Sequence, residues 1–212
     1  LFVTVFETQS GDPGYNPEFD LTGDGVVNLN DFISFTEAFG TIQEDQPPNR
    51  GFEVYVVDFG ADFVGVIDFG SNLFQEYLTF RGPSGMTISK DEESIYISEA
   101  FGLFVMNAEL ELQFSVPLES AGRVVLSPDE NLAYVAEAFT SQVTIIDVER
   151  REPVDTIGVG TAPQQLGLTP DGGKLYVMNA LSFDISVLDL VRGEEVGRID
   201  VGSQPVDMRI TA

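Results

Sequence analysis

Histidine and cysteine are both absent from this chain of 212 residues. Without histidine the chain lacks the commonest general base, the Ser-His-Asp triad and ordinary zinc or haem ligation. Without cysteine it has no disulfide, no thiolate metal site and no cysteine nucleophile. These absences exclude the enzyme classes that depend on either side chain, and we assign no catalytic residue.

Basic side chains and long apolar runs are also scarce. Lysine occurs only at Lys90 and Lys174, and 35 acidic residues against 10 basic ones give a formal charge of −25. Such a surface repels nucleic acid and anionic membranes, so neither is expected as a partner. No stretch approaches the roughly 20 apolar residues of a membrane span, and no basic leader is present, so any signal peptide is expected to lie outside this chain. The acidic excess fits a salty or calcium-containing exterior, which predicts an extracellular or cell-surface location.

A tyrosine-centred strand pattern recurs four times, at intervals of 41, 38 and 42 residues: Tyr55, Tyr96, Tyr134 and Tyr176. Each copy holds short apolar runs separated by Pro-Asp-Gly or glycine-rich turns, which indicates strands joined by tight connections. In the last copy we expect four strands, at 165–168, 174–178, 184–188 and 195–199. A repeat of about 40 residues with four strands predicts a β-propeller.

The last two repeats carry the most specific signature. Ser127-Pro128-Asp129 and Thr169-Pro170-Asp171 precede the tyrosine strands, which continue as Tyr134-Val135 and Tyr176-Val177. These residues resemble the YVTN family of β-propeller repeats, which occurs in extracellular and surface-layer proteins and is related to lactonase-like propellers. The resemblance covers 52–212, which we expect to be the propeller domain, and leaves 1–51 as a separate N-terminal segment.

The phase of the repeat predicts how the ring closes. The first unit begins at its second strand, Glu53–Val57, and the last unit is followed by a lone inner-strand pattern, Val206–Thr211. A ring whose final strand completes its first blade has this layout, which removes open sheet edges. We therefore expect an all-β, four-bladed propeller of four-stranded antiparallel blades closed by the C-terminal strand. An eight-bladed ring of two chains is the alternative, so a monomer is favoured and a dimer is left open.

The N-terminal segment contains a calcium-loop pattern. Oxygen-bearing side chains fall at loop positions 1, 3, 5, 9 and 12, which are Asp20, Thr22, Asp24, Asn28 and Asp31. Gly25 stands at position 6, and Val26 at position 7 would contribute its backbone carbonyl. This is the EF-hand spacing, because a hard cation needs several oxygen ligands and the glycine permits the sharp turn between them. The pattern predicts a Ca²⁺ site.

The surroundings of this loop complete the predicted segment. An apolar stripe over Asn30–Phe39 predicts an exit helix that Gly40 ends, and no helix enters the loop. A loop with an exit helix alone, and with the sequence Leu21–Val27, resembles one half of a dockerin module. Leu1–Thr8 reads as a strand, and Gln46–Gly51, with two prolines, as the linker.

One polar position recurs just past the end of the tyrosine strand. Alignment of the four units places Asp58, Glu99, Glu137 and Asn179 there, at the face of a propeller where ligands usually bind. Three carboxylates and an amide in a ring could hold a cation or shift one another's pKa. The alternative is that they support the local turn. The next positions hold Phe59, Phe101, Phe139 and Leu181, which we interpret as packing between blades.

Two functions follow from these features. The favoured one is a secreted or cell-surface, calcium-stabilised propeller that acts as a non-catalytic binding or structural module, with a protein or small-molecule ligand at its mouth. The alternative is a calcium-dependent hydrolase similar to propeller lactonases, in which a metal in the channel activates water without histidine.

Overall fold

The computed structural model describes residues 8–11, 17, 20, 22–28, 53–58, 60, 62–68, 73–108, 110–203 and 205–210. The chain divides into two compact units, one formed by 1–56 with 64–77 and the other by 57–63 with 78–212. The predicted boundary at residues 51 and 52 stays a prediction. The predicted exit helix, most of the predicted first strand and the linker lie outside the described residues.

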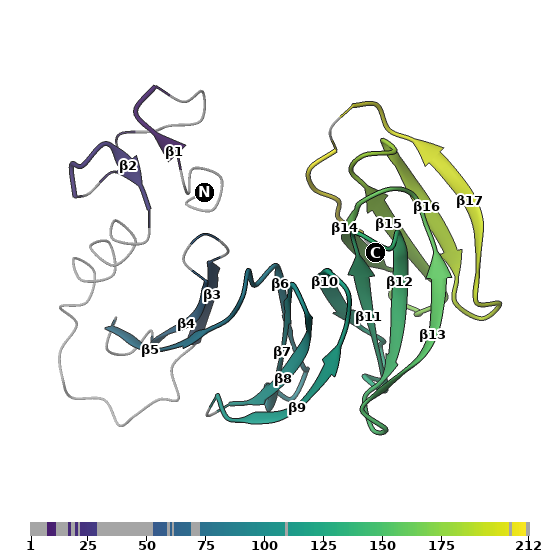
Figure 1. Ribbon diagram of the computed structural model, residues 1–212, viewed down its shortest axis with the longest axis horizontal. Helices are drawn as coiled ribbons and strands as arrows, with labels where there is room; N and C mark the ends of the chain where they lie inside the picture. The colour runs from purple at the N-terminus through teal and green to yellow at the C-terminus, as the bar shows by residue number, and fades with distance from the viewer. Residues whose placement is uncertain are drawn as a thin grey trace. The chain divides into compact units, whose positions relative to one another are not determined.

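The second unit contains three four-stranded antiparallel sheets that follow one another along the chain (Figure 1). The first consists of β6 (Gly85–Ile88), β7 (Ser94–Glu99), β8 (Gly102–Asn107) and β9 (Leu112–Pro117). The second consists of β10 (Ala121–Leu126), β11 (Leu132–Glu137), β12 (Gln142–Asp147) and β13 (Glu152–Gly158). The third consists of β14 (Pro163–Leu168), β15 (Lys174–Asn179), β16 (Asp184–Asp189) and β17 (Glu194–Asp200). In each sheet the strands pair in chain order, as the repeat predicts.

Alternation along the strands gives each sheet an apolar face toward its neighbour. One core cluster joins the first two sheets, with Tyr96 and Val105 on one side and Val124 and Val135 on the other. A second cluster joins the next two, where Tyr134 packs with residues such as Val177 and Leu188. The sheets therefore pack face to face in series, and the described residues show an all-β, propeller-like arrangement.

A hydroxyl–carboxylate pair closes the turn before the tyrosine strand in each of the three four-stranded sheets. Ser127 Oγ donates to Asp129 Oδ1 at 2.6 Å and accepts the Leu132 N–H at 3.0 Å. The corresponding pairs are Ser89 with Asp91 and Thr169 with Asp171. In all three, the hydroxyl hydrogen bond is the main cause that lowers the pKa of the aspartate below its ordinary value. These hydrogen bonds therefore stabilise the turns locally, and two of the three are the predicted Pro-Asp turns.

These turns predict an acid-sensitive contribution to stability. Because the folded state favours the carboxylates of Asp91, Asp129 and Asp171, their stabilisation is present at neutral pH. It is lost as the pH falls below 3.8, the ordinary pKa of an aspartate, and through their lowered pKa values. We expect the melting temperature of the wild type to fall more steeply below about pH 4 than that of the triple Asp→Asn variant. Thermal unfolding monitored by circular dichroism across this range measures the difference, and parallel curves would refute the role of the turns.

The remaining strands form two smaller sheets. β1 (Thr8–Gln9) pairs with β2 (Val26–Val27), and β3 (Glu53–Asp58), β4 (Phe63–Asp68) and β5 (Leu73–Thr79) form a three-stranded sheet. The predicted closing strand differs from the structure, because residues 205–210 form no strand and β3 pairs with β4 alone among the described residues. Blade count and ring closure therefore stay predictions.

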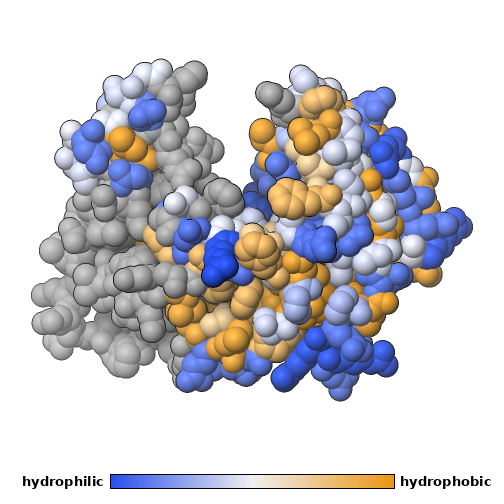
Figure 2. Space-filling view, in the orientation of Figure 1, coloured by the Kyte–Doolittle hydropathy of each residue, from blue (hydrophilic) through white to orange (hydrophobic). Residues whose placement is uncertain are grey.

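The surface of the described sheets is mixed in polarity. Figure 2 shows apolar side chains that reach the surface in separate patches between hydrophilic ones. No helix among the described residues is both long and apolar enough to cross a membrane.

Candidate functional site

The described part of the predicted calcium loop curls around the Asp20 carboxylate. Asp20 Oδ1 accepts the N–H groups of Gly23 at 2.7 Å and Asp24 at 3.1 Å, and Oδ2 accepts that of Gly25 at 2.9 Å. Gly23 and Gly25 adopt φ angles of +73° and +85°, a conformation that favours glycine and makes the sharp turn possible. The two glycines therefore permit the sharp turn, and the calcium-loop assignment stays a prediction.

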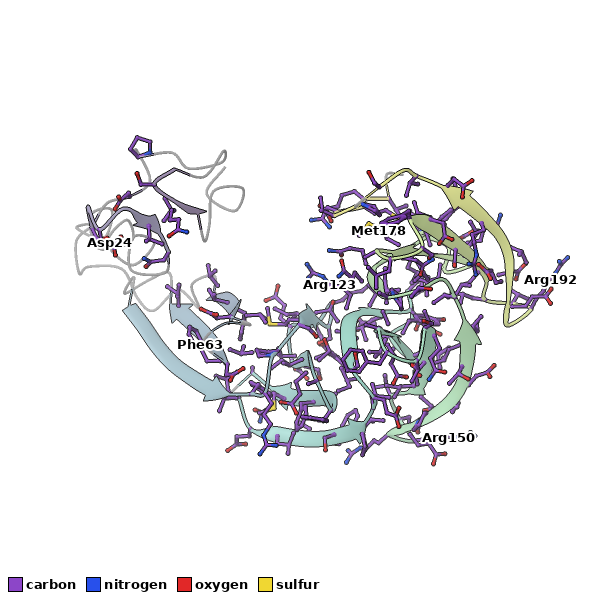
Figure 3. The ribbon with its side chains drawn as sticks, turned by 45° about the horizontal axis from the view of Figure 1, so that its top comes forward. Asp24, Phe63, Arg123, Arg150, Met178 and Arg192 are labelled. Atoms are coloured by element: carbon purple, nitrogen blue, oxygen red, sulfur yellow. The ribbon has the colours of Figure 1, made fainter. Side chains whose placement is uncertain are left out.

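The next loop residues bring further oxygens together. Asp24, labelled in Figure 3, is exposed, and its Oδ1 accepts the Val26 N–H at 2.9 Å. The Asn28 side-chain amide lies 3.4 Å from the Val26 carbonyl oxygen, so loop positions 7 and 9 are neighbours. The Asp20 carboxylate, the Asp24 carboxylate and the Val26 carbonyl thus belong to one short turn. The oxygen donors fit Ca²⁺, and Asp31 lies outside the described residues.

The recurring polar position is buried and serves the backbone of its own sheet. Glu99 and Glu137 are 7% and 3% exposed. Glu99 Oε2 accepts the Arg81 N–H at 2.7 Å, and Glu137 Oε2 accepts the Glu119 N–H at 2.8 Å. Both carboxylates thus fasten the end of the tyrosine strand to the segment that leads into the inner strand. Asp58 ends β3 and is half-buried.

The last two sheets extend this position into a side-chain network. Glu137 Oε1 accepts hydrogen bonds from Gln142 Nε2 at 3.0 Å and from the Thr144 hydroxyl. In the next sheet the chemistry is reversed: the donor is Asn179 Nδ2, and its acceptors are Asp184 Oδ1 at 2.7 Å and Ser186 Oγ at 2.9 Å. Asn179 Oδ1 is buried and has no hydrogen-bond partner among the described residues.

The sequence analysis did not identify these network partners. Gln142 and Thr144 follow Glu137 by five and seven residues, and Asp184 and Ser186 follow Asn179 at the same intervals. This repeated polar spacing was the available signal. Among the described residues no three carboxylates gather closely enough to hold a metal ion. Glu99, Glu137 and Asn179 instead form hydrogen bonds at the ends of their own sheets.

The apolar residues after the polar position do not pack between blades where the structure describes them. Phe101, Phe139 and Leu181, here called the rim residues, are 63%, 88% and 66% exposed. The interpretation of these three as inter-blade packing was wrong, because the turns carry them beyond the sheet faces. Phe59 lies outside the described residues. Near the same end of the second sheet, the exposed Arg123 projects from the inner strand β10 (Figure 3).

A separate hollow of about 510 Å³ lies over the first four-stranded sheet of the second unit. Its lining consists of Leu78, Phe80, Arg81, Glu99, Phe104, Met106 and Leu112. Phe80 meets Phe104 edge to face, with ring centroids 5.7 Å apart. Because Phe104 and Met106 alternate with the core residues of β8, the hollow lies on the sheet face that points away from β10–β13.

Comparison with known proteins identifies the fold and no family. No protein-family model matches the sequence, and no curated protein matches it. Among solved structures, Kuenenia stuttgartiensis hydrazine synthase is similar with a TM-score of 0.63 and 19% identity, over 69% of this chain and 45% of that one. A putative 6-phosphogluconolactonase from Bacteroides uniformis is similar with a TM-score of 0.66 and 18% identity, over 77% of this chain and 59% of that one. The chain thus matches about half the length of these proteins, and the similarity supports a propeller-like fold.

Proposed function

We propose that this chain is a calcium-stabilised, non-catalytic binding module of YVTN-type propeller repeats that works outside the cell and binds its ligand through the rim residues. The observation that carries the proposal is that polar and apolar side chains at the strand ends differ in burial. The polar side chains, Glu99, Glu137 and Asn179, are buried and bonded within their own sheets, while the apolar side chains that follow are presented to solvent. Apolar side chains that gather on one exposed surface mark interaction sites, and these three follow equivalent strands of successive sheets.

The chemistry of this surface supports a ligand with apolar groups. Phe139 at 88% exposed and Leu181 at 66% offer large side chains that a partner would cover completely. Aromatic side chains of this kind often dominate binding energy once they are desolvated. The exposed Arg123, near the same end of the second sheet, adds a positive charge, which favours an acidic group on the ligand at that point.

The dockerin-like loop supports the calcium component and the extracellular location of this proposal. Extracellular calcium-binding modules have dissociation constants of about 0.1–1 mM, and a loop with these oxygen donors suits that range. The acidic surface fits the same environment, where counter-ions screen self-repulsion.

Peptide-library selection on the immobilised chain tests the binding surface. We expect the selected peptides to be rich in apolar and acidic residues, and the Phe139→Ser variant to bind them at least about tenfold more weakly. The matched control is Val191→Ser, which alters a side chain that is 89% exposed in a turn at the opposite end of the third sheet. Equal loss in both variants, or in neither, would place the binding surface elsewhere.

A calcium-dependent, lactonase-like hydrolase is the second candidate. The similarity to a structure described as a putative 6-phosphogluconolactonase favours it, as does the presence of Glu99 in the lining of the hollow. Against it, the carboxylates of Glu99 and Glu137 already accept backbone hydrogen bonds.

A lactone assay separates the two candidates. We expect no hydrolysis of δ-gluconolactone above the uncatalysed rate in a pH-stat, with or without Ca²⁺. A rate that requires Ca²⁺ and is lost in Glu137→Gln, with unchanged circular dichroism, would replace the binding proposal with the hydrolase.

A further inference from the structure

The third four-stranded sheet has a second apolar face, which the rest of the described chain leaves partly uncovered. One face packs on the second sheet through Leu166, Leu175, Val177 and Leu188. On the opposite face lie Tyr176, Ile185, Val187 and Ile199, here called the open face, because they alternate with the core residues and face one another across the strand register. Ile199 is 48% exposed, and the other three are partly exposed.

The repeat shows what this face is built to contact. The residues 42 positions earlier are Tyr134, Val143, Ile145 and Ile157, and all four are buried against the third sheet. In the first sheet, Tyr96 and Val105 are buried against the second sheet in the same way. The open face therefore continues a series of two established interfaces between sheets, and its composition suits another sheet of the same repeat.

The C-terminal residues 205–210 lie where the inner strand of that next sheet would lie. Residues 205–210 follow 163–168, which form β14, by 42 positions. A Cβ added to Gly167 of β14 would lie 2.9 Å from Ile210 and 3.2 Å from Met208, so these side chains pack directly on β14. The segment thus occupies the position of an inner strand, yet residues 205–210 pair with no strand in the described chain.

The sheet that fits there is β3–β5, which begins at the second strand of the repeat. In other repeats the residues that face the preceding sheet flank the tyrosine, as Ala133 and Val135 do. Val54 and Val56 hold these positions around Tyr55, and both are partly exposed. The β3–β5 sheet therefore presents an apolar face that could cover the open face.

The greater length of similar propeller-like chains supports a second copy of this chain as the source of that sheet. The matches cover 69% and 77% of this chain but only 45% and 59% of those chains, so the compared proteins contain about as much chain again beyond the matched part. We propose that the open face is a self-association surface that receives the β3–β5 sheet of a second copy, head to tail, and that two copies close the ring. This arrangement covers both apolar faces of each chain and places residues 205–210 beside β3 of the second copy, where an inner strand belongs.

Solution mass tests this proposal independently of the rim. Multi-angle light scattering at tens of micromolar should give the mass of two 23.1 kDa chains. Ile199→Glu places a charge on the open face and should halve the mass, while circular dichroism stays that of the wild type. The matched control is Val154→Glu on the outer strand β13, where the side chain is 44% exposed, and it should leave the dimer intact.

A mixing experiment distinguishes a second copy from any other occupant. Ile199→Glu disables the open face, and Val56→Glu disables the face that docks there, so each variant alone should be monomeric. An equimolar mixture should regain dimers, because one of the two head-to-tail interfaces joins two unaltered faces. A monomeric wild type, masses above two chains, or a mixture that stays monomeric would overturn the proposal.

Discussion

Replacement of Glu137 by alanine should lower the free energy of unfolding by about 3 kcal/mol. The carboxylate is 3% exposed and accepts hydrogen bonds from the Glu119 N–H, from Gln142 and from the Thr144 hydroxyl. Its removal leaves these donors without an acceptor, and Thr144 is itself buried. Each unsatisfied buried group costs about 1–3 kcal/mol, although water entering the vacated space offsets part of the sum. Urea denaturation of the purified variant measures the loss.

The neighbouring Glu119 provides the control. Its side chain is exposed, and only its backbone N–H contacts Glu137, so Glu119→Ala should change stability by less than about 0.5 kcal/mol. Glu137→Gln keeps one acceptor oxygen and should fall between the two. If Glu137→Ala has the same free energy of unfolding as the wild type, the buried carboxylate is not part of the scaffold. That result would favour a functional role for the strand-end position.

Calcium should produce the second large effect. A ligand that binds only the folded state at 100 times its dissociation constant adds about 2.7 kcal/mol of stability. We therefore expect Ca²⁺ to raise the melting temperature of the transition that involves the N-terminal unit, and chelation by EDTA to reverse the rise. Asp24→Ala should abolish this shift, because it removes a carboxylate from loop position 5 and the acceptor of the Val26 N–H.

Glu152→Ala controls for the general effect of removing one negative charge. Glu152 is exposed at the start of β13, far along the chain from the loop, so this variant should respond to Ca²⁺ as the wild type does. Mg²⁺ should be a weaker substitute, because it demands a more regular geometry and dehydrates reluctantly. A wild-type melting temperature that ignores both Ca²⁺ and EDTA would contradict the calcium-loop assignment.

The strands were predictable because their determinants are local. Alternating apolar residues and Pro-Asp turns placed the strand around Tyr176 at 174–178, and the structure extends it by one residue to Asn179. That extra residue matters: Asn179, Glu137 and Glu99 were expected just beyond the strand and instead form its buried last position. A polar residue at a strand end looks like the start of a turn, since sequence does not show that a backbone N–H from another segment will meet it.

The exposure of the rim was not predictable for a related reason. Phe139 looks like a core residue by composition, and only the path of its turn leaves it 88% exposed. For the open face, the sequence predicts the apolar pattern but not its exposure. Its apolar pattern was visible in the repeat, but whether another sheet covers Ile199 depends on the curvature of the whole array, which no single repeat encodes.

A crystal structure grown with Ca²⁺, with anomalous data collected for the metal, tests the central claim most directly. We claim that the polar strand ends are scaffold and that the metal chemistry lies in the loop. The expected map has one calcium peak among Asp20, Asp24 and Asp31, and no peak beside Glu99, Glu137 or Asn179. A calcium ion held by Glu99 and Glu137, with a coordination position open to solvent, would contradict the account and favour the hydrolase.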